Sequence, residues 1–117
     1  MKNSYRGLVV WQKSMVLVKS LYEATSAFPP KEIYGLTSQI RRCGISIPSN
    51  IAEGKYRSSE KEFVQFLRMA YSSGAELETQ LEIALMVGYL FQKDYNKLVS
   101  ELEEIMKMLN ALIRKIK

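Results

Sequence analysis

Two short lines of polar residues are the part of this sequence whose types and spacing are best suited to chemistry. The first line has spacings of four, four and three residues, which place its side chains on one helix face: Arg42, Ser46, Asn50 and Glu53. The second line is spaced similarly and consists of Ser73, Glu76 and Gln80. If the two helices pack together, Arg42 can pair with Glu76. Asn50 can then bond Gln80 or a backbone carbonyl freed by Pro48.

Three interpretations of these polar lines stay open. The first is a network that fixes bundle register or subunit pairing, as a buried asparagine does in coiled coils. The second is contact with a ligand or RNA. The third is acid–base catalysis by carboxylates such as Glu53, Glu76 and Glu82. Di-iron bundles use Glu-x-x-His pairs, which this chain lacks, so we assign both lines to structure first.

A basic corner is expected where the second helix turns into the third. It contains four cations and one aromatic ring: Lys55, Tyr56, Arg57, Lys61 and Arg68. Basic residues beside an exposed ring can hold phosphates and stack a base. The alternative is a solvated turn, and no RNP1 or zinc-finger motif accompanies the corner. We interpret the four cations as candidate phosphate contacts and Tyr56 as a candidate base stacker.

The missing residue types exclude several kinds of enzyme. There is no histidine, the commonest general base, and only one cysteine, Cys43. A single cysteine rules out an intrachain disulfide and a cysteine metal cage, and we expect Cys43 to be a small buried residue. No P-loop, Rossmann glycine pattern or nucleophile elbow is present. We therefore expect no metal, no cofactor and no enzymatic activity.

Length and charge suggest a small basic domain. The 117 residues are 47% hydrophobic, and we expect residues 1–117 to form one globular domain. The net charge is +5, although residues 69–104 carry seven acidic and two basic side chains. A basic balance favours an anionic partner. The longest uncharged apolar stretch, residues 83–91, is too short to cross a membrane, so we expect a cytoplasmic protein with no membrane partner.

Apolar residues recur at helical spacing along almost the whole chain. They predict helices over residues 8–27, 31–53, 58 or 59–91, and 95–115. Pro29 and Pro30 end the first helix. Ser59 with Glu62 forms a capping box for the third, and Asp94 caps the fourth. Short connections and near seven-residue spacing predict an all-α fold, an antiparallel up-down-up-down four-helix bundle.

Special residues are expected to shape the packing. Pro48 lies inside the second helix, where Gly44 can absorb the distortion, so we expect a kinked but continuous helix. Gly54 suits the C-terminal cap of that helix. Gly74 and Gly88 would allow close approach of the third helix. The fourth helix carries an extra apolar row, which predicts a second contact within the bundle or with another subunit: Val99, Met106 and Ile113.

Two consecutive segments resemble a known family. The first runs from Phe28 to Gly54 and reads FPPKEIYGLTSQIRRCGISIPSNIAEG. The second ends at Leu90 and reads KYRSSEKEFVQFLRMAYSSGAELETQLEIALMVGYL. Both closely resemble the 23S rRNA intervening-sequence proteins, and the stretch WQKSMVLV, which begins at Trp11, is similar too. The SIPSNIAEG stretch is the most specific part of the resemblance.

The resemblance implies a four-helix bundle of bacterial origin with no established enzyme activity. It also implies a homopentamer, since the family is similar to accessory proteins of diversity-generating retroelements, which form a pentameric barrel and bind nucleic acid and a reverse transcriptase. The family's motif positions correspond here to Gly35, Gln39, Arg42, Ser46, Pro48, Asn50, Glu53, Gly54, Arg57, Ser73, Glu76 and Gln80. The chain departs from the family at Ser72, where glycine is frequent, and at Cys43, where alanine is usual.

Two function hypotheses follow. The first is a non-enzymatic, oligomeric protein that binds ribosomal RNA or another nucleic acid through phosphates at the basic corner. The second is a protein-interaction scaffold that recruits a partner enzyme such as a reverse transcriptase. It is motivated by the wide apolar face of the last helix and by the acidic residues between 76 and 104. The salt dependence of binding distinguishes the two hypotheses, because phosphate binding weakens steeply as the salt concentration rises.

Overall fold

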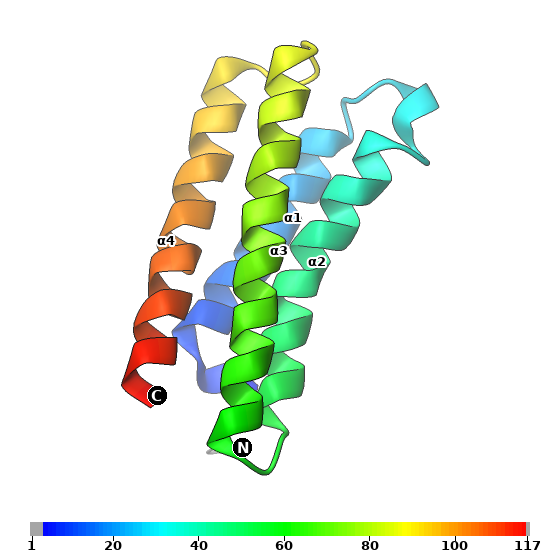
Figure 1. Cartoon of the computed structure of the whole chain (residues 1–117). Coiled ribbons are helices and arrows are strands. Elements are labelled where there is room, and N and C mark those ends of the chain that lie inside the picture. Colours follow the sequence, from blue (N-terminus) through cyan, green and yellow to red (C-terminus); the bar gives the residue numbers. More distant parts are fainter. Residues whose placement is uncertain (1–3, 117) are drawn as a thin grey trace.

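The computed structural model describes residues 4–116, and four helices make up most of them (Figure 1). The elements are η1 (Tyr5–Gly7), α1 (Val9–Thr25), η2 (Pro30–Glu32), α2 (Leu36–Lys55), α3 (Glu60–Met86) and α4 (Gln92–Ile116). Each helix runs antiparallel to the one before it, in a bundle of 43 × 22 × 21 Å. Residues 4–116 contain no strand, which confirms the predicted all-α four-helix bundle. None of the helices in this part of the chain is long and apolar enough to cross a membrane.

Aliphatic side chains fill the space between the four helices. Those with almost no exposed surface are Leu17, Leu21, Ile40, Ile47, Ile51, Leu67, Leu77, Leu81, Leu102, Ile105 and Leu109. The extra apolar row of α4 packs here too, because Val99 and Met106 lie against the core and Ile113 is buried. The neighbours of α4 are α1 and α3. The second contact predicted for this helix therefore lies within the bundle.

The start of α2 differs from the prediction. Residues Pro30–Glu32 form a 3-10 turn, and α2 begins at Leu36 rather than at residue 31. The Glu32 carboxylate takes the place of a cap, because it accepts from the backbone N–H of Leu36 at 3.0 Å and from the Tyr89 hydroxyl at 2.9 Å. A Cβ at Gly35 would lie 2.6 Å from this carboxylate, so glycine leaves it room. The prediction was wrong because the second partner of Glu32 lies 57 residues away in the sequence.

The ends of α3 and α4 are also shifted. Ser59 caps α3 as predicted, since its hydroxyl accepts from the N–H of Glu62 at 3.1 Å. The helix ends at Met86 rather than at residue 91, because Gly88 takes a φ of 85° and turns the chain. Gly88 therefore forms a turn, and the close packing predicted for it is wrong. Asp94 lies in the first turn of α4 instead of capping it, because that helix begins at Gln92.

Three glycines inside helices allow close packing. Pro48 lies within a continuous α2, as predicted. A Cβ at Gly44 would overlap Leu21 of α1, and one at Gly74 would overlap Met106 of α4, which confirms the close approach predicted for Gly74. Gly54 does not end α2, so the cap prediction was wrong. A Cβ there would lie 2.6 Å from the Cβ of Phe66 on α3.

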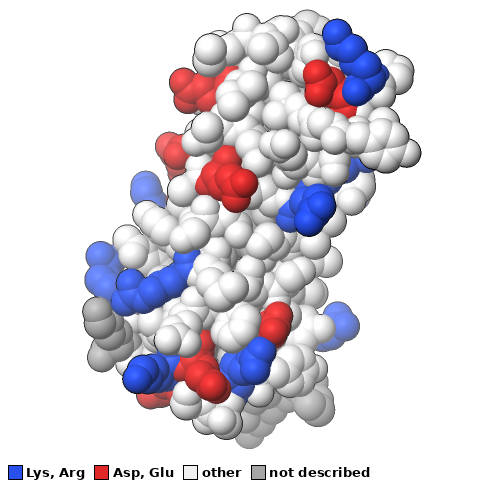
Figure 2. Space-filling view, turned by 45° about the vertical axis from the view of Figure 1, so that its right-hand side comes forward, with Lys and Arg blue, Asp and Glu red and all other residues white. Residues whose placement is uncertain are grey.

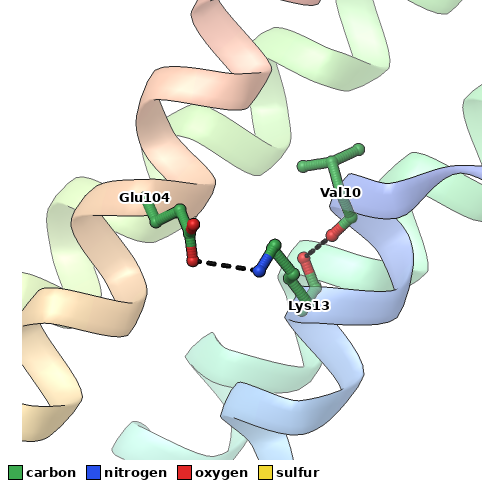
Figure 3. A network of polar contacts seen from close by, with 4 residues as sticks. Val10, Lys13 and Glu104 are labelled. Atoms are coloured by element: carbon green, nitrogen blue, oxygen red, sulfur yellow. Dashed lines mark hydrogen bonds and ion pairs between the residues drawn. The ribbon is translucent and has the colours of Figure 1, made fainter.

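An ion pair links α1 to α4 on the surface (Figure 3). Lys13 Nζ lies 3.2 Å from Glu104 Oε1, and both side chains are well exposed. Such a pair contributes about 1 kcal/mol or less. The next residue, the buried Ser14, donates its hydroxyl to the carbonyl of Val10 one turn earlier at 2.7 Å. The core contacts, rather than this pair, hold the two helices together.

Gly54→Ala and Gly74→Ala form a matched test of the close packing. Helix propensity alone favours alanine by up to about 1 kcal/mol. At position 54 the methyl group meets Phe66 next to its backbone, so we expect a loss of about 1–3 kcal/mol of unfolding free energy. At position 74 the flexible Met106 side chain can move, so we expect a change within about 1 kcal/mol. Urea denaturation measures both, and a Gly54→Ala protein as stable as wild type would contradict this assignment.

Part of the stability should depend on the charge of Glu32. The hydrogen bonds from the Leu36 N–H and then from Tyr89 hold the pKa of this carboxyl below its ordinary value. The stabilisation is therefore complete above the ordinary pKa and is lost as pH falls through the lower folded-state value. Glu32→Gln has only one side-chain oxygen to accept both bonds, so it should be less stable than wild type at neutral pH.

Urea midpoints at neutral pH and at about pH 3 measure this effect. The gap between wild type and Glu32→Gln should shrink at the lower pH. Tyr89→Phe, which removes one of the two donors, should reproduce part of the loss at neutral pH. A gap of equal size at both pH values would mean that the charge of Glu32 does not stabilise the fold.

Candidate functional site

The polar lines of α2 and α3 meet around Ser46 and Ser73. Their hydroxyl oxygens lie 2.8 Å apart. The Asn50 amide donates to the carbonyl of Ser46 at 2.8 Å and to its hydroxyl at 2.9 Å. The Cys43 thiol donates to the carbonyl of Ser73 at 3.0 Å. These bonds link the two helices at a defined register.

The two pairings predicted across the lines do not form. Among residues 4–116, Arg42 makes no ion pair with Glu76, and Asn50 bonds its own helix rather than Gln80. Since Ser46 lies opposite Ser73 in an antiparallel pair, later residues of α2 face earlier residues of α3, which separates position 50 from position 80. The carbonyl that Pro48 leaves without an N–H partner belongs to residue 44, whereas Asn50 bonds the carbonyl of Ser46.

A polar groove of about 480 Å³ runs between α2 and α3 beside the two serines. Its walls carry charged, amide, hydroxyl and thiol groups: Tyr34, Ser38, Gln39, Arg42, Cys43, Ser46, Ser73, Glu76 and Gln80. Five residues of the predicted lines therefore share it, whereas Asn50 and Glu53 lie outside. Gln39 lies three residues before Arg42 and is already among the motif positions that the family resemblance implies. Tyr34 precedes α2, and no helical spacing points to it.

Gln80 is the buried polar group of this groove. Only 7% of the residue is exposed, and its Oε1 atom has no hydrogen-bond partner among the described residues. Buried acceptors are nearly always paired in folded proteins. Because this oxygen has almost no accessible surface, a molecule in the groove reaches it only after the Gln80 side chain turns.

Cys43 is buried beside the groove, as predicted. Burial, and then the negative charge of Glu76, raises the pKa of its thiol to about 12. The thiolate is the nucleophilic form of cysteine, so Cys43 is a weak nucleophile at neutral pH. The influence of Glu76 also means that its carboxylate lies close to the thiol. Within residues 4–116, no three His, Cys, Asp or Glu side chains gather as metal ligands.

The predicted basic corner is divided between two hollows at the end of the bundle where α2 turns into α3. Lys55 and Arg57 line the first hollow, together with Lys115 from the end of α4. Lys61 and Arg68 line the second. Both hollows are bordered by Ile116 and Glu60, so all these cations surround the last turn of α4. We call the surface formed by Lys55, Arg57, Lys61, Arg68 and Lys115 the basic end.

Some of these charges are already engaged within the protein. Arg57 pairs with Glu53 at 2.8 Å, and its guanidinium lies 4.7 Å from the centre of the Phe66 ring. Lys55 Nζ lies 5.6 Å from the centre of the Phe63 ring. The pair between Arg57 and Glu53 is exposed to solvent, so an incoming anion can compete for the arginine.

Tyr56 belongs to an aromatic cluster at the same end. It is 76% exposed, and its ring packs edge-to-face with that of Tyr5, with centroids 5.8 Å apart. Tyr5 also contacts Trp11 at 5.0 Å, and the Arg6 guanidinium lies 5.5 Å and 5.8 Å from these two rings. No spacing in the sequence predicts this cluster, because most of α1 and the whole of α2 lie between Tyr56 and its other members.

The charges are distributed unevenly along the bundle. Figure 2 turns the α2 side of the molecule forward, and lysine and arginine prevail over the lower part of this face, among a few carboxylates. Its upper part carries side chains of both signs. The end that holds the α2–α3 turn is therefore the more favourable one for an anionic ligand.

Thiol labelling tests the environment of Cys43. Because the chain has one cysteine, labelling reports this residue alone. With its pKa raised to about 12, iodoacetamide at mildly alkaline pH should modify the folded protein at least about a hundredfold more slowly than the urea-unfolded chain. Glu76→Gln removes a negative neighbour and should accelerate labelling, whereas Glu78→Gln should not. Equal rates for folded and unfolded protein would contradict this assignment.

Comparison with known proteins agrees with the fold. The chain is similar to a protein of unknown function from the S23 ribosomal protein family of Bacteroides thetaiotaomicron, known from a crystal structure. The TM-score is 0.83 and the identity 27%, over 97% of this chain and 99% of that chain. Among curated proteins, no sequence matches. The model of a family described as 23S rRNA-intervening sequence protein matches residues 6–111. Because this match spans most of the sequence, the chain belongs to the family of 23S rRNA-intervening sequence proteins.

Proposed function

We propose that this protein binds ribosomal RNA or another nucleic acid through the basic end, and that it acts by binding rather than by catalysis. The observation that carries the proposal is the convergence of cations from α2, α3 and α4 around the last turn of α4. Contacts to phosphates need positive charge and reach, and they do not depend on base sequence. An arrangement drawn from three helices fits a phosphate backbone better than one isolated basic turn does.

Tyr56 adds a second kind of contact to this surface. Its exposed ring lies beside Arg57 in the sequence and packs edge-to-face with Tyr5. Base stacking on such a ring contributes about 1–3 kcal/mol per base and tolerates any sequence. Single-stranded RNA offers unstacked bases as well as phosphates. The basic end is therefore better suited to loops and single strands than to a regular duplex.

The weak nucleophilicity of Cys43 supports the non-enzymatic part of the proposal. The thiol has a raised pKa and donates to a backbone carbonyl of the neighbouring helix. Both features are those of a structural residue, because catalytic cysteines have lowered pKa values. The hydroxyls of Ser46 and Ser73 bond each other and Asn50. These groups hold helices together.

We also propose that copies of the chain assemble, as a pentamer in keeping with the family resemblance. The outer face of α1 bears large apolar side chains that are 41% to 58% exposed: Val9, Met15, Val16 and Tyr22. An apolar groove between α1 and α4 adjoins Val9. Apolar surface of this kind is typical of contacts between proteins. Assembly would repeat the basic end and so raise its avidity for a long polyanion.

The same apolar face favours the second candidate function, a scaffold that recruits a partner enzyme such as a reverse transcriptase. Light scattering distinguishes self-assembly through this face from binding of a different protein. An oligomeric mass supports contact between copies of the chain. A mass of one chain would contradict assembly and leave the α1 face to a different protein.

Removing charge at the two ends of the bundle tests nucleic-acid binding. The test variant is Lys55→Gln/Arg57→Gln/Lys61→Gln. The matched control, Lys31→Gln/Lys93→Gln/Lys97→Gln, removes the same charge at the opposite end. Each phosphate contact contributes about 0.7–0.9 to the slope of log K against log salt. We expect the test variant to bind at least about tenfold more weakly and to lower the slope by about 2, while the control binds like wild type.

Fluorescence anisotropy with structured ribosomal RNA fragments, single strands and duplex DNA, repeated over a salt series, measures these affinities. All variants must first show the oligomeric mass and melting temperature of wild type. If both triple variants lose affinity equally, binding follows net charge and not the basic end. If wild type does not bind even at low salt, the proposed function is wrong.

A further inference from the structure

The polar groove between α2 and α3 plays no part in phosphate binding at the basic end. One of its polar atoms also lacks a hydrogen-bond partner. Gln80 Oε1 is a buried acceptor without a partner in the described part of the chain. The residue lines the groove and is 7% exposed. An unpaired buried acceptor costs about 1–3 kcal/mol, so turning the Gln80 amide towards a donor bound in the groove would be favourable.

Opposite charges stand on the two walls of the groove. Arg42 comes from α2 and Glu76 from α3, yet among residues 4–116 neither belongs to an ion pair. The carboxylate of Glu76 lies close enough to Cys43 to influence its thiol, which places it at the groove. The groove thus offers a fork of N–H donors on one side and a pair of acceptor oxygens on the other. Both remain available to one bound molecule.

An aromatic ring completes the arrangement. Tyr34 lines the groove and is 95% exposed. A side chain this large and apolar is expected to bury its face when a partner is available. A flat ligand that stacks on it and presents acceptors to Arg42 and donors to Glu76 would match all three groups.

Guanine is the nucleic-acid base with this combination. Its O6 and N7 atoms accept a bidentate arginine, while its N1–H and 2-amino group are neighbouring donors that match a carboxylate. Adenine and cytosine offer one amino group beside acceptors, and uracil offers a single N–H between two carbonyls. We propose that the groove binds an unpaired guanine base, with Arg42 on O6 and N7, Glu76 on the two neighbouring donors, Gln80 on the remaining amino hydrogen, and Tyr34 against the ring.

This inference deepens the proposed function and rests on it for the source of the base, which is an RNA strand. The groove and the basic end share α2 and α3, and positions 42 and 55 lie about 20 Å apart along the helix axis. A single strand whose phosphates lie at the basic end can therefore place a base in the groove of the same or a neighbouring copy. A free guanine nucleotide carries the same base and is the other source to test.

Two labelled seven-nucleotide RNAs test the inference: one of adenosines only, and one with a central guanosine. They have the same length and charge, so phosphate binding affects them equally. We expect the guanosine RNA to bind about five- to tenfold more tightly, because one bidentate base contact discriminates by at least this factor. A third RNA with inosine at the centre lacks the 2-amino group and should lose part of the gain.

Substitutions in the groove test whether the groove causes the preference for the guanosine RNA. Glu76→Gln and Arg42→Gln should each reduce the guanosine preference to less than about twofold. The matched control Glu78→Gln lies on the same helix outside the groove and should retain it. If Glu76→Gln or Arg42→Gln instead changes the oligomeric mass, the groove is a contact between protein chains and the inference is wrong.

The outcomes separate this inference from the proposed function. Equal, salt-dependent binding of the adenosine and guanosine RNAs overturns the guanine site and leaves nucleic-acid binding in place. If no RNA binds, GMP and AMP are compared by NMR titration of the ¹⁵N-labelled protein. A preference for GMP that Glu76→Gln abolishes supports a site for the free nucleotide, and equal responses to the two nucleotides overturn the guanine site altogether.

Discussion

The close contact between α2 and α3 is the constraint on which the rest of the structure depends. Gly54 brings the end of α2 against the backbone side of Phe66, and Ser46 bonds Ser73 further along the same pair. Two contacts so far apart allow only one register. That register places Arg42 and Glu76 on facing walls of one groove, and it directs the α2–α3 turn towards the end of α4. Both candidate binding surfaces therefore follow from how tightly this one helix pair packs.

Much of the fold could be predicted because helical periodicity is a local property. The apolar rows, the Ser59 cap and the continuous helix through Pro48 all depend on residues within a few turns of one another. The start of α2 could not be predicted in this way, because Glu32 is held by Tyr89 from the α3–α4 connection at the same end of the bundle. Gly88 shows the same limit, because a glycine suits a helix interface and a turn equally well until its φ is known.

For the candidate site, the sequence predicted which helix faces meet. It did not predict which residues on those faces contact each other. Spacing placed Ser46 and Ser73 on faces that meet, but the expected pairing of Asn50 with Gln80 required a register that local sequence does not encode. Register depends on where a glycine lets two backbones approach. Lys115 joined the basic end for a similar reason, because only the length and direction of α4 bring its last turn beside the start of α3.

The two surfaces differ in what they can contribute to recognition. Around the last turn of α4, cations alternate with Glu53 and Glu60, so each copy attracts a polyanion only weakly, and affinity depends on how many copies engage. The groove presents fixed donors and acceptors in place of net charge, and such groups discriminate between ligands more than they attract them. In the proposed function, the basic end attracts RNA by charge and the groove selects an unpaired base. Tight packing of α2 against α3 is what keeps the groove rigid enough for that selection.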